Sequence, residues 1–171
     1  MSLACIKCIS NRKVSYFNDQ VSKEFKVDCV FNSSLKLFSS FQQIEISNTE
    51  NSIICIGPVS TSVYINNCRN CVIAVTCRQI RIHDSHDLKI WLSCCTPPLL
   101  EKCFNIIFDI KKKDNTNFYM QFENHLQEVD MDTSEFLTEC NFKVSDLSWL
   151  KIQNSPNWEF GKVCLEEYLS E

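Results

Sequence analysis

Glycine is nearly absent from this chain of 171 residues, which contains only Gly57 and Gly161. The phosphate-binding loop of P-loop proteins and the dinucleotide-binding fingerprint each need at least two glycines close together. The sequence therefore excludes both motifs. We expect any nucleotide chemistry to take place on a nucleotide that a partner protein holds.

Long apolar segments are also missing. No apolar run approaches the roughly eighteen residues that a membrane-spanning helix needs, so we expect no membrane span. The first eight residues lack the apolar core of a signal peptide, and Ser2 stands where N-myristoylation requires a glycine. We therefore expect neither a secretory leader nor that lipid anchor.

A third absence is a run of basic residues interleaved with aromatic ones, which is typical of nucleic-acid binders. The net charge of −4 is unevenly placed. Residues 1–113 carry 14 basic and 9 acidic side chains, whereas residues 114–171 carry 3 and 12. We expect no nucleic-acid partner, and we place a boundary at residue 113.

Cysteine, by contrast, is abundant, with twelve residues. In a small secreted protein this number would indicate a disulfide scaffold. Here many cysteines lie within apolar, strand-like segments and no signal peptide is recognisable. We therefore interpret them as reduced thiols that pack as small hydrophobic side chains.

Two pairs of cysteines, Cys5 with Cys8 and Cys68 with Cys71, have the spacing of zinc ligands. The repeat described next places Cys68 and Cys71 at interior positions, so we expect no metal site. A cysteine hydrolase is also disfavoured, because no histidine shows the pairing with a cysteine that such an enzyme needs.

Five segments between Phe25 and Ile110 repeat one short pattern. An Asn or Asp holds the same place in each, at spacings of 19, 19, 17 and 18: Asn32, Asn51, Asn70, Asp87 and Asn105. Within each segment apolar residues alternate with polar ones, as in strands with one buried face, and short polar bends follow. Two strands per period of just under twenty residues predict an all-β solenoid, the parallel β-helix.

Stacked coils place equivalent residues about 4.8 Å apart. We therefore expect the side chains of Asn32, Asn51, Asn70 and Asn105 to form a hydrogen-bonded ladder. The alternation also predicts the interior side chains, among them Ile54, Ile65, Ile73, Ile82, Ile90 and Leu100.

The chain is predicted to form a single domain with three parts. Residues 1–24 form an N-terminal segment that adds a strand or caps one end, and residues 25–113 form the coils. Residues 114–171 form an acidic C-terminal cap of extended and short helical pieces that packs on the β-helix, since the ends of solenoids need covering.

Within the cap we expect a strand at Phe118–Phe122 and a short helix in 132–139, where Asp132 is a capping residue. Trp149 and Trp158 are predicted to belong to an extended tail that packs its aromatic rings on the solenoid.

One strand of the fourth repeat holds the residues most able to carry chemistry. Because Ile80 and Ile82 are predicted to face inward, the side chains between and beside them face outward. The repeat register adds neighbours from the adjacent coils, which gives one outward patch: Tyr64, Asn66, Gln79, Arg81, His83 and Glu101. The patch is either a solvated face with a weak Arg–Glu pair or an arginine, oriented by Glu101 and Gln79, that enters another protein's phosphate site.

The sequence resembles the C-terminal domain of the tubulin-binding cofactor C family, which is shared with the retinitis pigmentosa protein. The resemblance covers roughly residues 50–160 and rests on several motifs in the same order: Gly57–Val63, Asn67–Cys71, Cys77–Ser85, Leu99–Glu101, Phe108, Leu147–Leu150 and Ser155–Trp158. It implies a right-handed parallel β-helix.

Residue by residue, the resemblance implies that Arg81 is an arginine finger that stimulates GTP hydrolysis by Arf-like GTPases. It implies that Gln79 is the companion glutamine and that Glu101 supports the arginine. No cofactor of its own is implied, since GTP and magnesium would be held by the partner. The remaining predicted contact residues are Tyr64, Asn66, Arg78, His83 and Leu147.

Two positions depart from the family pattern. Members commonly have a second glutamine where this chain has Arg78, and a phenylalanine where it has Leu147. These differences concern the choice of partner more than the arginine itself.

The resemblance thus implies a GTPase-activating domain of the tubulin-folding pathway, without an enzymatic nucleotide site. Its expected partners are an Arf-like GTPase and tubulin together with other tubulin-folding cofactors, in the cytoplasm and at the cytoskeleton. One alternative is an interaction module that binds tubulin or a GTPase without stimulating hydrolysis. A second alternative is an actin-binding relative, which the Gln79-Ile80-Arg81 motif disfavours.

Overall fold

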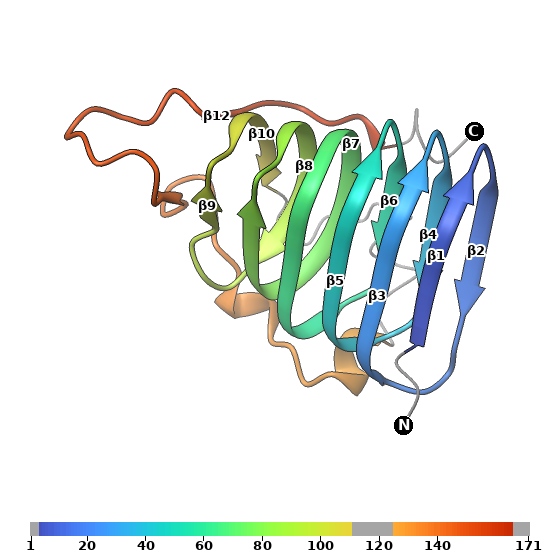
Figure 1. Cartoon of the computed structure of the whole chain (residues 1–171). Helices are drawn as coiled ribbons and strands as arrows, with labels where there is room; N and C mark the ends of the chain where they lie inside the picture. The colour runs from blue at the N-terminus through green and yellow to red at the C-terminus, as the bar shows by residue number, and fades with distance from the viewer. Residues whose placement is uncertain (1–3, 111–124, 166–171) are drawn as a thin grey trace.

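The computed structural model describes residues 4–110 and 125–165 and shows a parallel β-helix (Figure 1). Its coils are stacked from β1 and β2 at one end to β9, β10 and β12 at the other. The predicted all-β solenoid is therefore confirmed. The elements are β1 (Ala4–Ser10), β2 (Lys13–Phe17), β3 (Ser22–Phe31), β4 (Ser34–Phe38), β5 (Phe41–Glu50), β6 (Ile53–Ile56), β7 (Val59–His83), β8 (His86–Cys94), β9 (Leu99–Glu101), β10 (Phe104–Ile110), η1 (Thr133–Glu135), β11 (Ser145–Asp146) and β12 (Trp158–Phe160).

Two parallel sheets form the walls of the β-helix. The front sheet runs β1, β3, β5, β7, β9, β11, and each strand pairs with the next. The back sheet runs β2, β4, β6, β7, β8, β10, β12. The long strand β7 contributes to both sheets because it runs around more than one coil. β1 and β2 belong to the same stack as the repeats.

The marker residues of the repeat lie at a corner where the chain changes direction. All of them have positive φ, between 48° and 55°: Asn32, Asn51, Asn70, Asp87 and Asn105. Asn and Asp adopt this left-handed conformation more easily than other residues with a Cβ atom. The repeated Asn or Asp therefore meets a backbone requirement that recurs once per coil.

The predicted side-chain ladder forms between Asn51 and Asn70, where Asn70 Nδ2 donates to Asn51 Oδ1 at 2.6 Å. Asn105 Nδ2 donates to Asp87 Oδ1, a contact that the prediction did not include. The fourth marker, an Asp, thus takes part in the ladder as an acceptor.

A second left-handed position, three residues before the first, was not predicted. It is occupied by residues of different types, with φ between 45° and 56°: Cys8, Cys29, Asn48, Asn67, Asp84 and Lys102. Asn11, also at positive φ, is a further marker that extends the first series into the N-terminal coil. The mixed residue types explain why the sequence did not reveal this second series.

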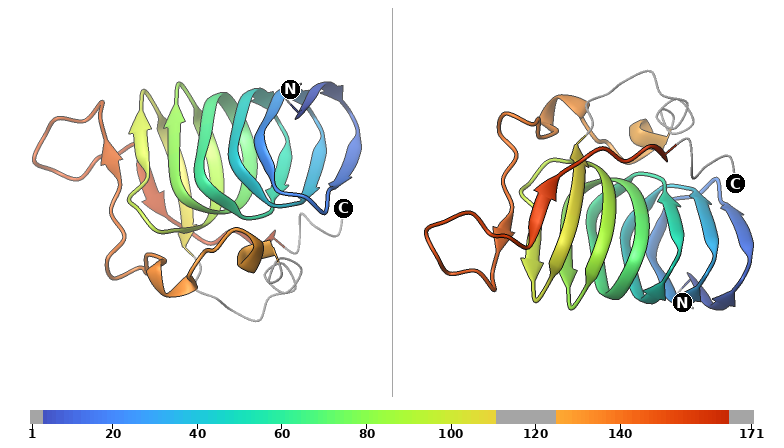
Figure 2. Two further views of the ribbon diagram at one scale, coloured as in Figure 1. Left: turned by 90° about the horizontal axis from the view of Figure 1, so that it is seen from below. Right: turned by 90° about the horizontal axis from the view of Figure 1, so that it is seen from above.

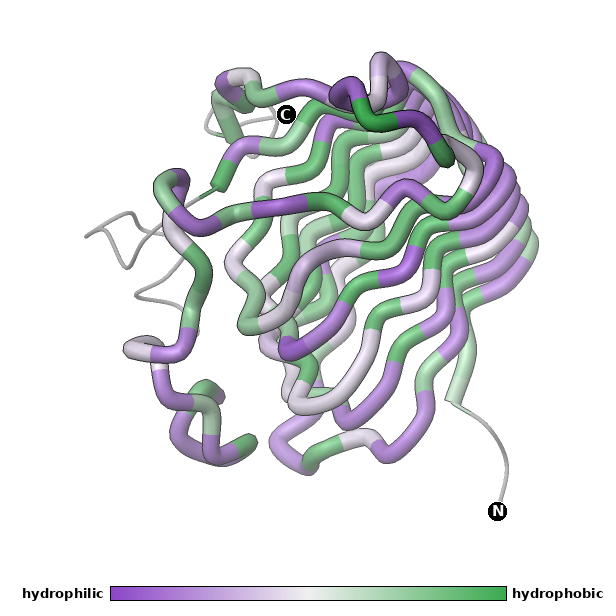
Figure 3. Tube along the Cα trace, turned by 90° about the vertical axis from the view of Figure 1, so that its left-hand side faces the viewer, coloured by the Kyte–Doolittle hydropathy of each residue, from purple (hydrophilic) through white to green (hydrophobic). Residues whose placement is uncertain are grey.

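The interior of the β-helix is the main hydrophobic core. The six predicted core residues named above are at most 1% exposed, which confirms the strand register. Figure 3 shows hydrophobic and hydrophilic positions alternating along the coils and lining up from one coil to the next. The core is thus built from ladders of equivalent side chains.

A second hydrophobic cluster lies outside the β-helix, between the back sheet and the C-terminal cap. Outward side chains of the back sheet, such as Trp91, pack against residues of the cap: Leu126, Met131, Phe136, Val163 and Leu165. In both views of Figure 2 the orange segment of the cap lies along the outside of the coils. The buried carboxylate of Asp109 accepts the Val163 N–H at 2.7 Å and adds a polar anchor.

The cap differs from its predicted form in detail. Residues 125–128 are helical, and η1 is only three residues long, with Asp132 as its N-cap. Trp158 packs on Phe108, as predicted, whereas Trp149 bonds within its own loop. The strand predicted at 118–122 lies outside the described residues. Among the described residues, no helix has the length and apolar character to cross a membrane.

Candidate functional site

The predicted patch lies on the outer surface of the front sheet. Arg81 is in register with Leu99, and His83 is in register with Glu101. Asn66 Oδ1 lies 3.3 Å from His83 Nδ1, across the predicted offset of 17 residues. We call this surface the Arg81 face, and it consists of Tyr64, Asn66, Gln79, Arg81, His83 and Glu101.

The backbone of Arg81 is fixed in β7, whereas its guanidinium points into solvent. Its neighbours Ile80 and Ile82 are buried in the interior. Because side chains alternate along a strand, the Arg81 side chain faces outward. The Arg81 side chain is exposed and forms no hydrogen bond or ion pair with any other residue that the structure describes. The half-buried Gln79 points outward from the same strand. A guanidinium presented in this way can bind an anion on another molecule.

His83 is the most connected side chain of the face. Its Nδ1 lies 2.9 Å from an Asp84 carboxylate oxygen, and its Nε2 lies 3.5 Å from Glu101 Oε2. In the described part of the chain the Glu101 carboxylate therefore pairs with His83 and not with Arg81. Glu101 and Arg81 lie on a diagonal of neighbouring strands, within reach of long side chains, but they form no hydrogen bond or ion pair among the described residues. The supporting role of Glu101 toward Arg81 therefore stays a prediction.

Arg78, at the start of the same strand segment, is held in place. Its Nη1 lies 3.3 Å from Glu135 Oε2, and its Nε donates to the Ser60 carbonyl at 3.3 Å. Glu135 belongs to η1, so this contact ties the cap to the β-helix. The two neighbouring arginines therefore differ: Arg78 is engaged within the chain, whereas Arg81 is available as far as the described residues show.

Leu147 follows β11, which adds one more strand to the front sheet. The Leu147 N–H donates to the Leu100 carbonyl at 2.8 Å, so this residue lies beside Glu101 at the edge of the Arg81 face. Its side chain is 56% exposed. Leu147 thus lies at the edge of the Arg81 face, whereas Arg78 contacts the cap and is not part of that face.

Asp146 is a site residue that the sequence did not reveal. One carboxylate oxygen accepts the Ser148 N–H at 3.0 Å, and the other accepts from Ser155 Oγ at 2.6 Å and Asn157 Nδ2 at 2.7 Å. The carboxylate thereby closes the loop between β11 and β12. The only signal in the sequence was the run of short polar residues around Ser155, which suits such bonds but does not name the acceptor.

Cys68 and Cys71, which have the spacing of zinc ligands, are free thiols that face the interior. Burial raises the pKa of the Cys68 thiol to about 12 and that of the Cys71 thiol to about 11. Cys71 is in register with Leu88, a core residue, as the repeat predicted. Among the described residues, no group of three His, Cys, Asp or Glu side chains is placed to hold a metal ion.

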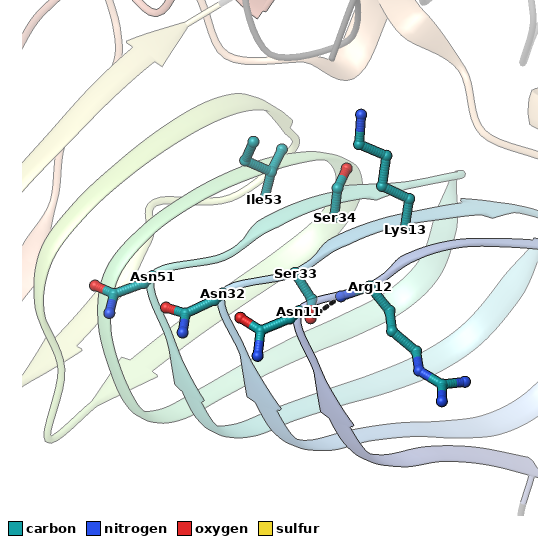
Figure 4. Close-up of a pocket in the computed structure, with 8 residues that line it drawn as sticks. All are labelled: Asn11, Arg12, Lys13, Asn32, Ser33, Ser34, Asn51 and Ile53. Carbon is teal, nitrogen blue, oxygen red and sulfur yellow. Dashed lines mark hydrogen bonds between the residues drawn. The ribbon is translucent and has the colours of Figure 1, made fainter.

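A polar groove lies elsewhere, at the N-terminal end of the stack (Figure 4). Its volume is about 450 Å³, and its lining includes the corner residues Asn11, Asn32 and Asn51 together with Arg12 and Lys13. None of its lining residues belongs to the Arg81 face. The candidate functional site is the Arg81 face, since an arginine that acts on another protein would need no pocket of its own.

Comparison with known proteins gives one consistent result. Residues 22–144 match the family model described as Tubulin binding cofactor C. The human protein named tubulin-specific chaperone C is 30% identical over 129 residues, which are 74% of this chain and 35% of the relative. The tubulin-folding cofactor C of Arabidopsis thaliana is 23% identical over 147 residues, covering 85% of this chain and 40% of the relative.

A solved structure shares the fold. Tubulin Binding Cofactor C from Leishmania major superimposes with a TM-score of 0.58 at 21% identity, covering 89% of this chain and 90% of that one. The chain spans about a third of the length of the human relative.

Proposed function

Because this chain belongs to the tubulin binding cofactor C family, we propose that it acts in tubulin folding as a GTPase activator that supplies Arg81 in trans. The partner protein holds GTP and magnesium and positions the attacking water. This chain adds one guanidinium at the moment when negative charge shifts on the transferring phosphoryl group. An arginine used in this way accelerates hydrolysis by about 10³–10⁵ in known systems.

The observation that carries the proposal is the state of Arg81. Its guanidinium is exposed and unpaired within the described residues, whereas its strand is fixed by the buried Ile80 and Ile82. A side chain that pairs within its own chain, like Arg78 with Glu135, would first have to break that contact. Arg81 has no such contact to break among the residues described.

The other residues of the face have supporting roles in this proposal. The Gln79 amide lies on the same outward side, two residues before Arg81, and offers a donor and an acceptor to the partner's phosphate site. Glu101, on the neighbouring strand, pairs with His83, which lies two residues after Arg81. When a partner covers the face, Glu101 is within diagonal reach to accept from Arg81 and orient it.

The partner is proposed to be a GTP-binding protein of the tubulin-folding pathway, either tubulin itself or an Arf-like GTPase. The names of the matching relatives connect them with tubulin. In this proposal the chain acts in the cytoplasm, in association with the cytoskeleton.

A single-turnover assay tests the proposal. GTP-loaded tubulin dimers and a GTP-loaded Arf-like GTPase are each incubated with and without this chain, and phosphate release is measured. We expect the chain to accelerate hydrolysis by at least one of the two proteins. Binding to both without acceleration would contradict the proposal and favour a non-catalytic interaction module.

A further inference from the structure

The loop between β11 and β12 carries large apolar side chains in contact with solvent. Leu150 is 93% exposed and Ile152 is completely exposed, and Leu147 at the base of the loop is 56% exposed. In Figures 1 and 2 this orange-red loop extends away from the body of the β-helix. Single exposed apolar residues are ordinary, but three within six positions mark a contact surface. We call residues 147–154 the apolar loop.

Polar contacts, rather than a core of its own, hold the apolar loop in shape. The Asp146 carboxylate closes its base, as described above, and the Lys102 N–H donates to Ser148 Oγ at 2.7 Å. The Trp149 indole N–H donates to the Gln153 carbonyl at 2.8 Å, and Lys151 Nζ lies 4.7 Å from the centre of the Trp149 ring. A loop fixed in advance loses little conformational entropy when it binds.

The apolar loop continues the Arg81 face. It starts at Leu147, which is bonded to the Leu100 carbonyl at the edge of that face. A protein that covers Arg81 and Glu101 would therefore also lie over the base of the loop. The loop contains one charged residue, Lys151, which already contacts Trp149. The tip thus offers apolar contacts and little charge, which suits a protein surface better than an anionic lipid surface.

We propose that the apolar loop is the anchor with which this chain grips the protein that receives Arg81. Leu150 and Ile152 enter an apolar depression on that partner, beside its GTP site. This inference rests on the proposed function and adds a division of roles. The loop contributes equally to the ground and transition states, so it sets the affinity, whereas Arg81 acts on the transition state and sets the rate.

The test compares the two roles in one assay. Stimulated hydrolysis by GTP-loaded tubulin dimers and by a GTP-loaded Arf-like GTPase is measured against the concentration of this chain. In the double variant Leu150→Ser, Ile152→Ser we expect the half-maximal concentration to rise about tenfold or more, with the maximal rate unchanged. Both side chains are exposed, so the melting temperature of the variant should match that of the wild type.

A matched control uses an exposed apolar residue at the opposite end of the stack. Phe17, in β2, is 69% exposed, and Phe17→Ser should leave both the half-maximal concentration and the maximal rate unchanged. A second measurement is independent of hydrolysis: the affinity of Arg81→Ala for the same two proteins, with and without the loop substitutions, by calorimetry. The loop substitutions should weaken this binding by the same factor.

The outcomes separate the anchor from the proposed function. An unchanged half-maximal concentration in the loop variant, with normal stimulation by the wild type, overturns the anchor alone. Binding that depends on the loop, without stimulation, upholds the anchor and contradicts the finger. Failure of the wild type to bind either protein overturns both. Dimerisation of the wild type that the loop substitutions abolish assigns the loop to a second copy and also overturns the anchor.

Discussion

Asparagine and aspartate recur in this chain because each coil contains a corner at positive φ, which most residues with a Cβ atom avoid. An L-residue in this conformation costs roughly 1–2 kcal/mol unless its side chain relieves the crowding through local polar contacts. The side chains at this corner also hydrogen-bond from one coil to the next, as Asn70 does with Asn51. One residue type thus satisfies both the backbone and the stacking.

Asp87 allows a test of how much one carboxylate at this corner stabilises the fold. Hydrogen bonds from Asn105 and His86 lower the pKa of Asp87 below its usual value of 3.8. A lowered folded-state pKa stabilises the fold above the unfolded pKa, and this stabilisation is lost as the pH falls through the folded pKa. We therefore expect Asp87→Asn to be less stable than wild type at pH 7, by no more than about 1 kcal/mol because the carboxylate is partly exposed.

Urea unfolding at pH 7 and at pH 3.5 measures this difference. Asn keeps the preference for positive φ, so the comparison isolates the charge. The gap between the two proteins should shrink at pH 3.5. A gap that stays constant or widens would show that the Asp87 carboxylate does not stabilise the corner.

Ile82 tests the interior position next to Arg81. Its side chain is 1% exposed, so Ile82→Asp would bury a charge without a partner. We expect a loss of more than about 4 kcal/mol, enough to unfold the domain. The exposed Lys89, changed to Asp, serves as the control and should melt close to wild type. Wild-type melting of Ile82→Asp would show that the strand register is wrong.

At the scale of elements, the alternating pattern predicted the strands, the core and the register of the Arg81 face. The pattern predicted these features because a parallel β-helix repeats the same environment in every coil, so the same alternation of apolar and polar residues recurs in each repeat. The pattern could not give the second left-handed series, where Cys29 and Lys102 occupy equivalent places. It also could not give the Arg78–Glu135 pair, because Glu135 lies in the cap, outside the repeat. The repeat did place Glu101 beside His83, as the structure shows, but the expected side-chain partner of Glu101 was Arg81.

The loop between β11 and β12 provides a test at this scale. Asp146→Ala removes the acceptor for Ser148, Ser155 and Asn157, so we expect the loop to open locally. Trypsin should then cleave after Lys151 about tenfold or more faster than in wild type. Cleavage after Lys89, within β8, should not change. Equal rates after Lys151 in the two proteins would mean that Asp146 does not hold the loop.

At the scale of the whole molecule, the two sheets of the β-helix have different roles. The back sheet is covered by the cap, which packs Phe136 and Val163 against Trp91. The front sheet carries the exposed Arg81, with the apolar loop at its edge. The cap thus completes the fold on one side, and in our proposal the other side receives the partner.

The substitution Arg81→Lys tests the central claim most directly. If Arg81 were only a surface cation, Lys would replace it, since both carry one positive charge and exposed pairs contribute little. A finger needs planar, multi-donor contacts with phosphate oxygens, and an ammonium group cannot reproduce that geometry. Glu101→Gln should have a smaller effect, because it loosens Arg81 without removing it.

The measurement is single-turnover GTP hydrolysis by the partner at a saturating concentration of this chain. We predict that Arg81→Lys folds and binds its partner as wild type does, yet loses stimulated hydrolysis on the order of 10²-fold or more. Full stimulation by Arg81→Lys would contradict the arginine finger.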